Sequence, residues 1–205
     1  EILKTPNLKK LRMENIGILP KEIEYFQSLE ELQIYNSDLK NIPNELYKLT
    51  NLKRLEISNC HVLSYPKEIS KLKHLERLRL CNRSKIDPVN LHHEYLVIPQ
   101  EVWKLKELRD LVLLCIDKRS LPSNNDKVKL ERIEKITLNQ VYSKNIVSKD
   151  YIDKFHHLVI TEVPDFLFEL KTLRELIISF PISKIPEKVF NLDDVSIYLF
   201  VDYGV

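Results

Sequence analysis

Residues 52–80 read LKRLEISNCHVLSYPKEISKLKHLERLRL, and this stretch holds one whole copy of a repeating unit followed by the start of the next. The spacing LxxLxL, in which L is leucine or another apolar residue, begins at Leu52 and begins again at Leu75, 23 residues later. A fixed period of about 20 to 50 residues is the sequence signature of a repeat architecture, in which each copy is one structural unit. The repeat therefore decides the fold.

The same spacing recurs along the whole chain. Apolar and polar residues alternate over the last positions of each copy, which indicates a short β-strand with one face buried. Nine copies predict nine strands, and their first apolar residues are Leu8, Leu29, Leu52, Leu75, Leu108, Ile133, Phe155, Leu173 and Val195.

A second motif follows most of these strands. It consists of an apolar residue, a proline, two mainly polar residues that usually include glutamate, and another apolar residue. Proline suits the start of a helical turn because its missing N–H is not needed there, and glutamate is favourable near the positive end of the turn. Each unit therefore reads as a strand, a loop and one or two helical turns on the opposite side. The motif occupies residues 19–23, 42–46, 65–69, 98–102 and 185–189.

The combined unit, LxxLxLxxxxLxxLPxEIxxLxx, closely resembles the leucine-rich repeat in its variety of about 23 residues, and the resemblance covers essentially the whole chain. It implies an α/β fold, a right-handed curved solenoid with a parallel concave β-sheet of about nine strands and short helical turns on the convex side. Physics agrees, because one unit cannot bury its leucines alone whereas stacked units share a continuous core.

The repeat predicts one domain over residues 1–205 with three irregular parts. Residues 1–7 align with residues 45–51, so they form a partial or degenerate cap or, as we favour, the back half of a unit preceded by more protein. Residues 75–107 form a long repeat with about ten extra residues around 82–96. Residues 195–205 form a degenerate last repeat or cap.

One position departs from the family pattern. The resemblance implies an asparagine ladder just beyond each strand, but here asparagine stands one place early, at Asn15, Asn36, Asn59 and Asn82. Ser37 and Cys60 are small enough to fill the ladder position itself, and the other units suggest a looser ladder.

The composition excludes several functions. The chain has 32 Lys and Arg against 30 Asp and Glu, and a net charge of +2 lacks the basic excess typical of nucleic-acid binders. Two glycines cannot build a phosphate-binding loop, and no apolar run is long enough to insert into a membrane. Three cysteines form no CxxC, and no nucleophile has a recognisable base beside it. We therefore predict no catalytic residues, no metal and no cofactor.

The repeat also predicts which side chains leave the core and face the concave side. Over the first four strands they are mainly charged, but from the fifth strand they become apolar and form a strip about 20 Å long. Contiguous exposed apolar area usually marks an interface, although strand propensity alone would also favour such residues. For the last strand, capping of the stack is an equal alternative. The predicted partner-binding residues are Tyr35, Arg79, Val112, Leu114, Val159, Ile177 and Leu199.

We therefore expect a non-catalytic module that binds a protein partner through its concave face. The LPKEI-type units look most like those of bacterial leucine-rich repeat proteins, including spirochaete ones, which implies a secreted or cell-surface protein that contacts host molecules. Residues 52–60 and 72–80 also resemble units of plant intracellular immune receptors, which would make the chain the sensing part of a larger receptor. Further alternatives are the substrate-recognition domain of a larger enzyme, such as a bacterial ubiquitin ligase, and self-association through the apolar strip.

Overall fold

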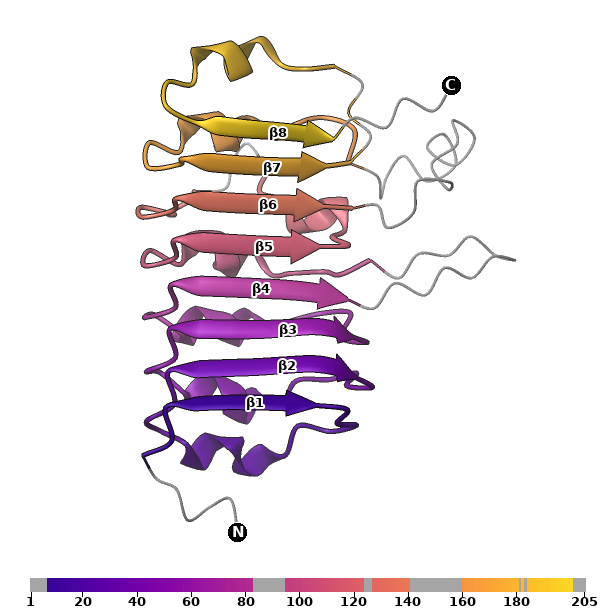
Figure 1. Ribbon diagram of the computed structural model, residues 1–205, viewed down its shortest axis with the longest axis vertical. Coiled ribbons are helices and arrows are strands. Elements are labelled where there is room, and N and C mark those ends of the chain that lie inside the picture. Colours follow the sequence, from indigo (N-terminus) through magenta and orange to yellow (C-terminus); the bar gives the residue numbers. More distant parts are fainter. Residues whose placement is uncertain are drawn as a thin grey trace, which may run out of the picture.

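A computed structural model describes residues 7–82, 95–123, 127–140, 160–180, 182 and 184–200. Over these residues the chain forms one parallel sheet of eight strands, which lie side by side in chain order (Figure 1). The strands are β1 (Lys10–Glu14), β2 (Glu31–Ser37), β3 (Arg54–Cys60), β4 (Arg77–Asn82), β5 (Asp110–Leu114), β6 (Lys135–Asn139), β7 (Glu175–Ser179) and β8 (Ser196–Phe200).

Short helical turns cover the other side of each unit, as the repeat predicts (Figure 1). All helices in the described residues are 3₁₀ turns: η2 (Lys21–Tyr25), η3 (Asn44–Lys48), η4 (Lys67–Lys71), η5 (Gln100–Lys104), η6 (Lys118–Ser120), η7 (Asp165–Glu169) and η8 (Glu187–Asn191). Proline precedes every turn except η6. It lies one residue before the turn rather than in its first position, and its carbonyl accepts the first bond, as from Ile23 N to Pro20 O at 3.2 Å. Because the chain is already extended at the proline, it can leave the loop and enter the turn without strain.

The apolar positions of the repeat form the core. Leu32, Leu55 and Leu78 lie directly opposite one another on neighbouring strands, and all three are buried. The same column continues through Leu111, Ile136 and Leu176. Full burial of one such side chain stabilises the fold by about 1.5–3 kcal/mol, so the stacked columns account for the solenoid.

The strand predicted at residues 155–160 lies outside the described part of the chain, apart from Ile160. β6 pairs directly with β7, with Ile136 opposite Leu176, which leaves no space for a strand between them. The sheet therefore has eight strands where we expected nine. Residues 141–159 lie outside the described part of the chain, but Ile160 is buried and its N–H donates to the side chain of Gln140.

The last strand has the opposite phase to the one predicted. Ile197 pairs with Leu176 and Leu199 pairs with Ile178, so both lie on the core side, where they pack against the core. The reason is that one residue is missing before this strand. Leu170 and Leu176 are six positions apart, whereas the equivalent residues of the last unit, Leu192 and Ile197, are only five apart. Side chains alternate along a strand, so a shift of one residue exchanges its two faces.

The early asparagines have a conformational explanation. Asn15, Asn36 and Asn59 have φ angles of 55°, 48° and 56°; Asn15 directly follows β1, and the other two are the second-last residues of β2 and β3. Asparagine tolerates this left-handed region better than most residues with a Cβ. The next position holds the ladder, where Ser37 Oγ accepts from Ile16 N at 3.2 Å, and where Ser37 pairs with Cys60. In β4 the register shifts and Asn82 takes that place opposite Cys60.

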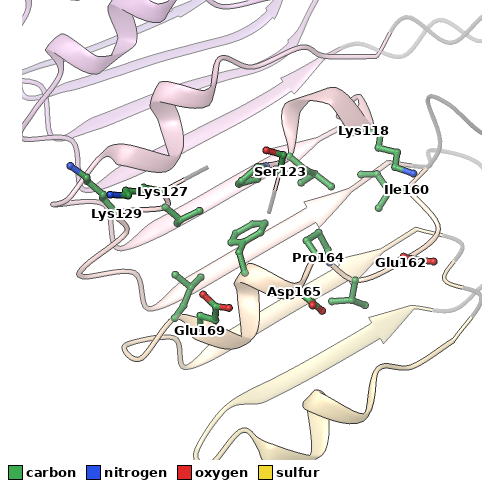
Figure 2. Close-up of a pocket in the computed structure, with 15 residues that line it drawn as sticks. Lys118, Ser123, Lys127, Lys129, Ile160, Glu162, Pro164, Asp165 and Glu169 are labelled. Carbon is green, nitrogen blue, oxygen red and sulfur yellow. The ribbon is translucent and has the colours of Figure 1, made fainter. Parts of the chain in front are cut away.

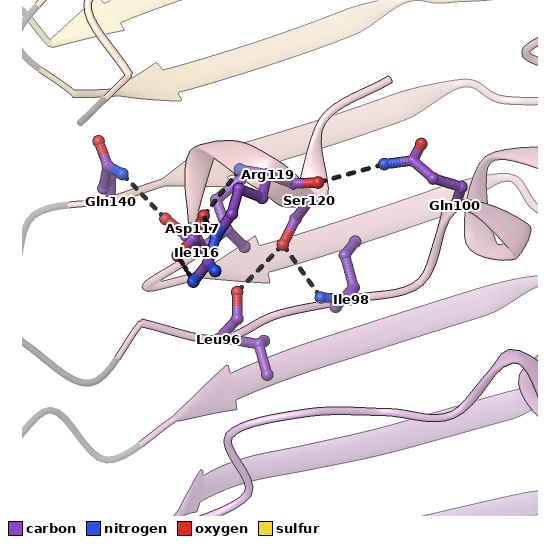
Figure 3. A network of polar contacts seen from close by, with 8 residues as sticks. All are labelled: Leu96, Ile98, Gln100, Ile116, Asp117, Arg119, Ser120 and Gln140. Carbon is purple, nitrogen blue, oxygen red and sulfur yellow. Dashed lines mark hydrogen bonds and ion pairs between the residues drawn. The ribbon is translucent and has the colours of Figure 1, made fainter. Parts of the chain in front are cut away.

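A buried polar network joins the end of the long repeat to the next unit (Figure 3). The hydroxyl of Ser120 donates to Leu96 O at 3.2 Å and accepts from Ile98 N at 3.0 Å. Asp117, also buried, accepts from Arg119 N at 2.7 Å at the start of η6. Each bond satisfies a buried group for which an unmade bond would cost free energy, so the network fixes the irregular region.

Candidate functional site

We call the side of the sheet opposite the 3₁₀ turns the concave face. Strand pairing aligns one central column of side chains across it: Arg12, Gln33, Glu56, Arg79, Val112, Thr137, Ile177 and Tyr198. A flanking column includes Tyr35 and Leu114. The structure thus brings five of the seven predicted residues onto one face, and their role in binding stays a prediction.

The other two predicted residues are not found there. Leu199 lies on the core side of β8, so its assignment to the concave face is wrong, and Tyr198 faces that way instead with 50% of its surface exposed. Val159 lies outside the described residues.

Four apolar side chains lie on the concave face over strands β5, β7 and β8. Val112, Leu114, Ile177 and Tyr198 form what we call the apolar patch, with Thr137 between Val112 and Ile177 on the intervening strand. Val112 is nearly buried at 9% exposed, and Leu114 and Ile177 are half-buried. Polar groups lie among these side chains, because Thr137 and the Lys135–Glu175 ion pair at 3.0 Å are on the same face of β6 and β7.

The other half of the concave face is charged and is organised by Glu56, which is only 7% exposed. Its carboxylate accepts from Arg54 Nη2 at 3.1 Å and lies 3.2 Å from Arg79 Nε. A buried carboxylate normally costs free energy unless it is paired and hydrogen-bonded, and these contacts supply that pairing. Sequence reasoning missed Glu56, because its position in the repeat predicts only an outward side chain.

Tyr35 joins the same group. Partial burial, a hydrogen bond to Glu56 and the charge of that carboxylate together raise the pKa of Tyr35 to about 12. Arg12 Cζ lies 4.9 Å from the centre of the Tyr35 ring, within the range of a cation–π contact. Glu56 therefore connects the predicted residues Tyr35 and Arg79, which come from different strands.

A small depression lies where the two halves meet. It has a volume of about 110 Å³ and is lined by Arg54, Leu55, Glu56, Arg77, Leu78, Arg79, Asp110 and Val112. Arg77 lies opposite Asp110 on the neighbouring strand. Burial raises the pKa of Asp110, and its buried Oδ1 has no hydrogen-bond partner. The depression is thus a polar site at the border of the apolar patch.

A larger hollow of about 970 Å³ lies on the convex side, away from every predicted site residue (Figure 2). Lys118, Lys127 and Lys129 line it together with Glu162, Asp165 and Glu169. The described residues between Pro122 and β6 form no 3₁₀ turn beside this hollow. Asp165 is already paired with Lys188 at 2.9 Å.

The described residues contain no group of three or more His, Cys, Asp and Glu side chains that could hold a metal ion. Burial raises the pKa of the thiols of Cys81 and Cys115, which disfavours the reactive thiolate. No helix among the residues that the structure covers is both long and apolar enough to cross a bilayer.

Comparison with known proteins agrees with the geometry. The sequence profile of the family described as "leucine-rich repeat region" matches residues 1–156. A leucine-rich repeat protein of Leptospira interrogans superposes with a TM-score of 0.69 and 26% identity over 98% of this chain and 45% of that one. The leucine-rich repeat domain of the type III effector XopL gives a TM-score of 0.65 and 18% identity over 96% of this chain and 70% of that one, which shows the shared fold alone.

No curated protein matches the sequence significantly. The chain spans less than half the length of the Leptospira protein that it resembles. The family profile covers more than half of the chain, and the eight-stranded stack carries the repeat in register. The chain therefore belongs to the leucine-rich repeat family.

Proposed function

We propose that the protein is a non-catalytic module that binds a protein partner through its concave face, with the apolar patch as the centre of the contact. The leucine-rich repeat fold supports protein–protein interaction in general. The observation that carries the finer proposal is the apolar patch, Val112, Leu114, Ile177 and Tyr198, on a face that is otherwise mainly polar and charged.

The energetics favour this face. Contiguous apolar area at a surface usually marks an interaction site, and desolvating it on binding is favourable. The strands that carry it are fixed by the leucine core, so binding orders few groups and costs little conformational entropy. The charged half then supplies the polar rim that interfaces normally have.

A capture experiment tests the proposal. We expect proteins retained by the immobilised wild-type chain to be lost with the double variant Leu114→Glu and Ile177→Glu. The matched control is Phe190→Glu, since Phe190 is 80% exposed on η8 and lies away from the concave face. Retention by the double variant, or equal loss with Phe190→Glu, would contradict the proposal.

The finer setting that we propose is a bacterial protein, secreted or displayed on the cell surface, whose partner is a host molecule. Its support is the similarity to the Leptospira interrogans protein. Detection of the chain by antibody on intact cells of the producing organism or in their medium tests it, and detection only after lysis would contradict it.

A further inference from the structure

The border between β4 and β5 places arginines beside apolar side chains on one face. Arg77 and Arg79 are two residues apart on β4, so both face the concave side about 7 Å apart. In the next strand Val112 lies directly opposite Arg79. These two guanidinium groups therefore border the apolar patch, where a partner that covers the patch can contact them.

The depression at this border carries an excess of positive charge. Three guanidinium groups line it, from Arg54, Arg77 and Arg79, against two carboxylates, from Glu56 and Asp110. Glu56 is engaged by Arg54 and Arg79. Arg77 is exposed and has no ion pair with the residues that the structure describes, although it lies opposite Asp110. One cation is thus available to a partner carboxylate, which guanidinium groups bind in preference to other groups.

The spacing of the face fits an extended peptide. From the β4 column, Ile177 on β7 lies three strand spacings away, or about 14 Å, and Tyr198 on β8 lies four away, or about 19 Å. An extended chain advances about 6.8 Å for every two residues. Consider a peptide that crosses the strands and makes its first contact at the β4 column. Its side chains two, four and six positions further along would then lie over the apolar patch.

We propose that the partner presents an extended segment with an acidic residue against Arg77 and Arg79 and apolar residues two, four and six positions away over the apolar patch. This inference rests on the proposed function and adds the chemistry of the partner. Glu56 is a positioning residue in this arrangement, because it holds Arg79 and Arg54 in place while the partner carboxylate binds between Arg77 and Arg79.

Selection from a displayed library of random 12-residue peptides tests the inference. The immobilised full chain is compared with the double variant Arg77→Ala and Arg79→Ala. The matched control is Lys67→Ala with Lys71→Ala, which removes two exposed cations of η4 on the convex side. We expect wild type and control to enrich peptides with the acidic-then-apolar spacing. The arginine variant should keep the apolar spacing, lose the acidic preference and bind a selected acidic peptide about tenfold more weakly.

Three results would overturn the inference: enriched peptides without an acidic preference, a preference for basic residues, and no enrichment on the wild-type chain. If the arginine double variant fails to fold, Arg77→Ala alone replaces it, because Arg77 has no ion pair among the described residues. Failure of the proposed function gives a different result, namely enriched peptides whose binding the Leu114→Glu and Ile177→Glu variant leaves unchanged. Concentration-dependent light scattering identifies a second copy as the occupant and would also overturn the inference.

Discussion

Trp103 packs edge-on against Phe166, with 5.0 Å between the ring centroids and 70° between the planes. The two residues belong to η5 and η7, which are separated by a whole unit of the stack. The unit between them contains only the short turn η6 (Lys118–Ser120) among its described residues, and the two rings pack directly against each other. The Trp103 indole N–H also donates to Ser120 O at 2.8 Å.

This contact predicts a specific effect of Phe166→Ala. An edge-to-face aromatic pair contributes about 0.5–1.5 kcal/mol beyond the area that it buries, so the free energy of unfolding should fall by at least that amount. Because Trp103 is the only tryptophan, its emission should move to longer wavelength as the indole becomes hydrated. Urea titration followed by fluorescence measures both. Phe190→Ala, at an exposed site, should change the free energy of unfolding by less than about 0.5 kcal/mol, and equal effects of the two variants would refute the contact.

Ser120→Ala tests the buried network. The substitution leaves Ile98 N without its partner, whereas Leu96 O still accepts from Asp117 N at 2.9 Å, and an unsatisfied buried group costs about 1–3 kcal/mol. The exposed Ser70, whose hydroxyl donates only to Lys67 O, is the matched control. Equal stability of the two alanine variants in chemical denaturation would show that the network does not hold the irregular unit.

The phase of β8 can be tested with two neighbouring aspartates. Leu199→Asp puts a carboxylate against the core and should destabilise the fold by about 1–3 kcal/mol. Tyr198→Asp replaces an exposed side chain on the concave face and should change the stability by less than about 0.5 kcal/mol. Thermal unfolding of the two variants distinguishes the phases, and the reverse order would restore the phase predicted from the sequence.

Most of the stack could be predicted from the sequence, because the apolar positions of the repeat are the positions that become buried. Leu32, Leu55 and Leu78 recur at one spacing, and each lies where the repeat places it. Val112 and Ile177 lie on the concave face, as predicted, because they occupy the outward positions of the same repeat. Leu199 does not, because a single missing residue before β8 inverts the phase while an apolar residue still follows at every expected position.

Other features were beyond sequence reasoning for physical reasons. The apolar pattern of residues 155–160 predicts a strand between β6 and β7, but these two strands pair directly, and the pattern follows burial alone, as at the buried Ile160. The role of Glu56 depends on contacts between three strands, whose pairing brings together residues about 23 positions apart. Such contacts leave no local signal around Glu56 itself.

Glu56→Gln should lower the pKa of Tyr35. Burial keeps part of the upward shift, but removal of the carboxylate charge favours the phenolate, so Tyr35 should lose its proton below pH 12. In the wild type the stability linked to this raised pKa is complete below about pH 10 and is lost as the pH rises through about 12. Nuclear magnetic resonance titration of ring-labelled tyrosine measures the pKa, with Tyr35→Phe assigning the signal. An unchanged pKa would exclude Glu56 as the centre of the charged half.

A photo-crosslinking amino acid at position 114 shows whether the concave face touches the partner. The same amino acid at position 190, on the convex end, is the reference. We expect the captured partner to be crosslinked to the chain at position 114 and not at position 190. Crosslinking from position 190 alone would contradict the proposed function.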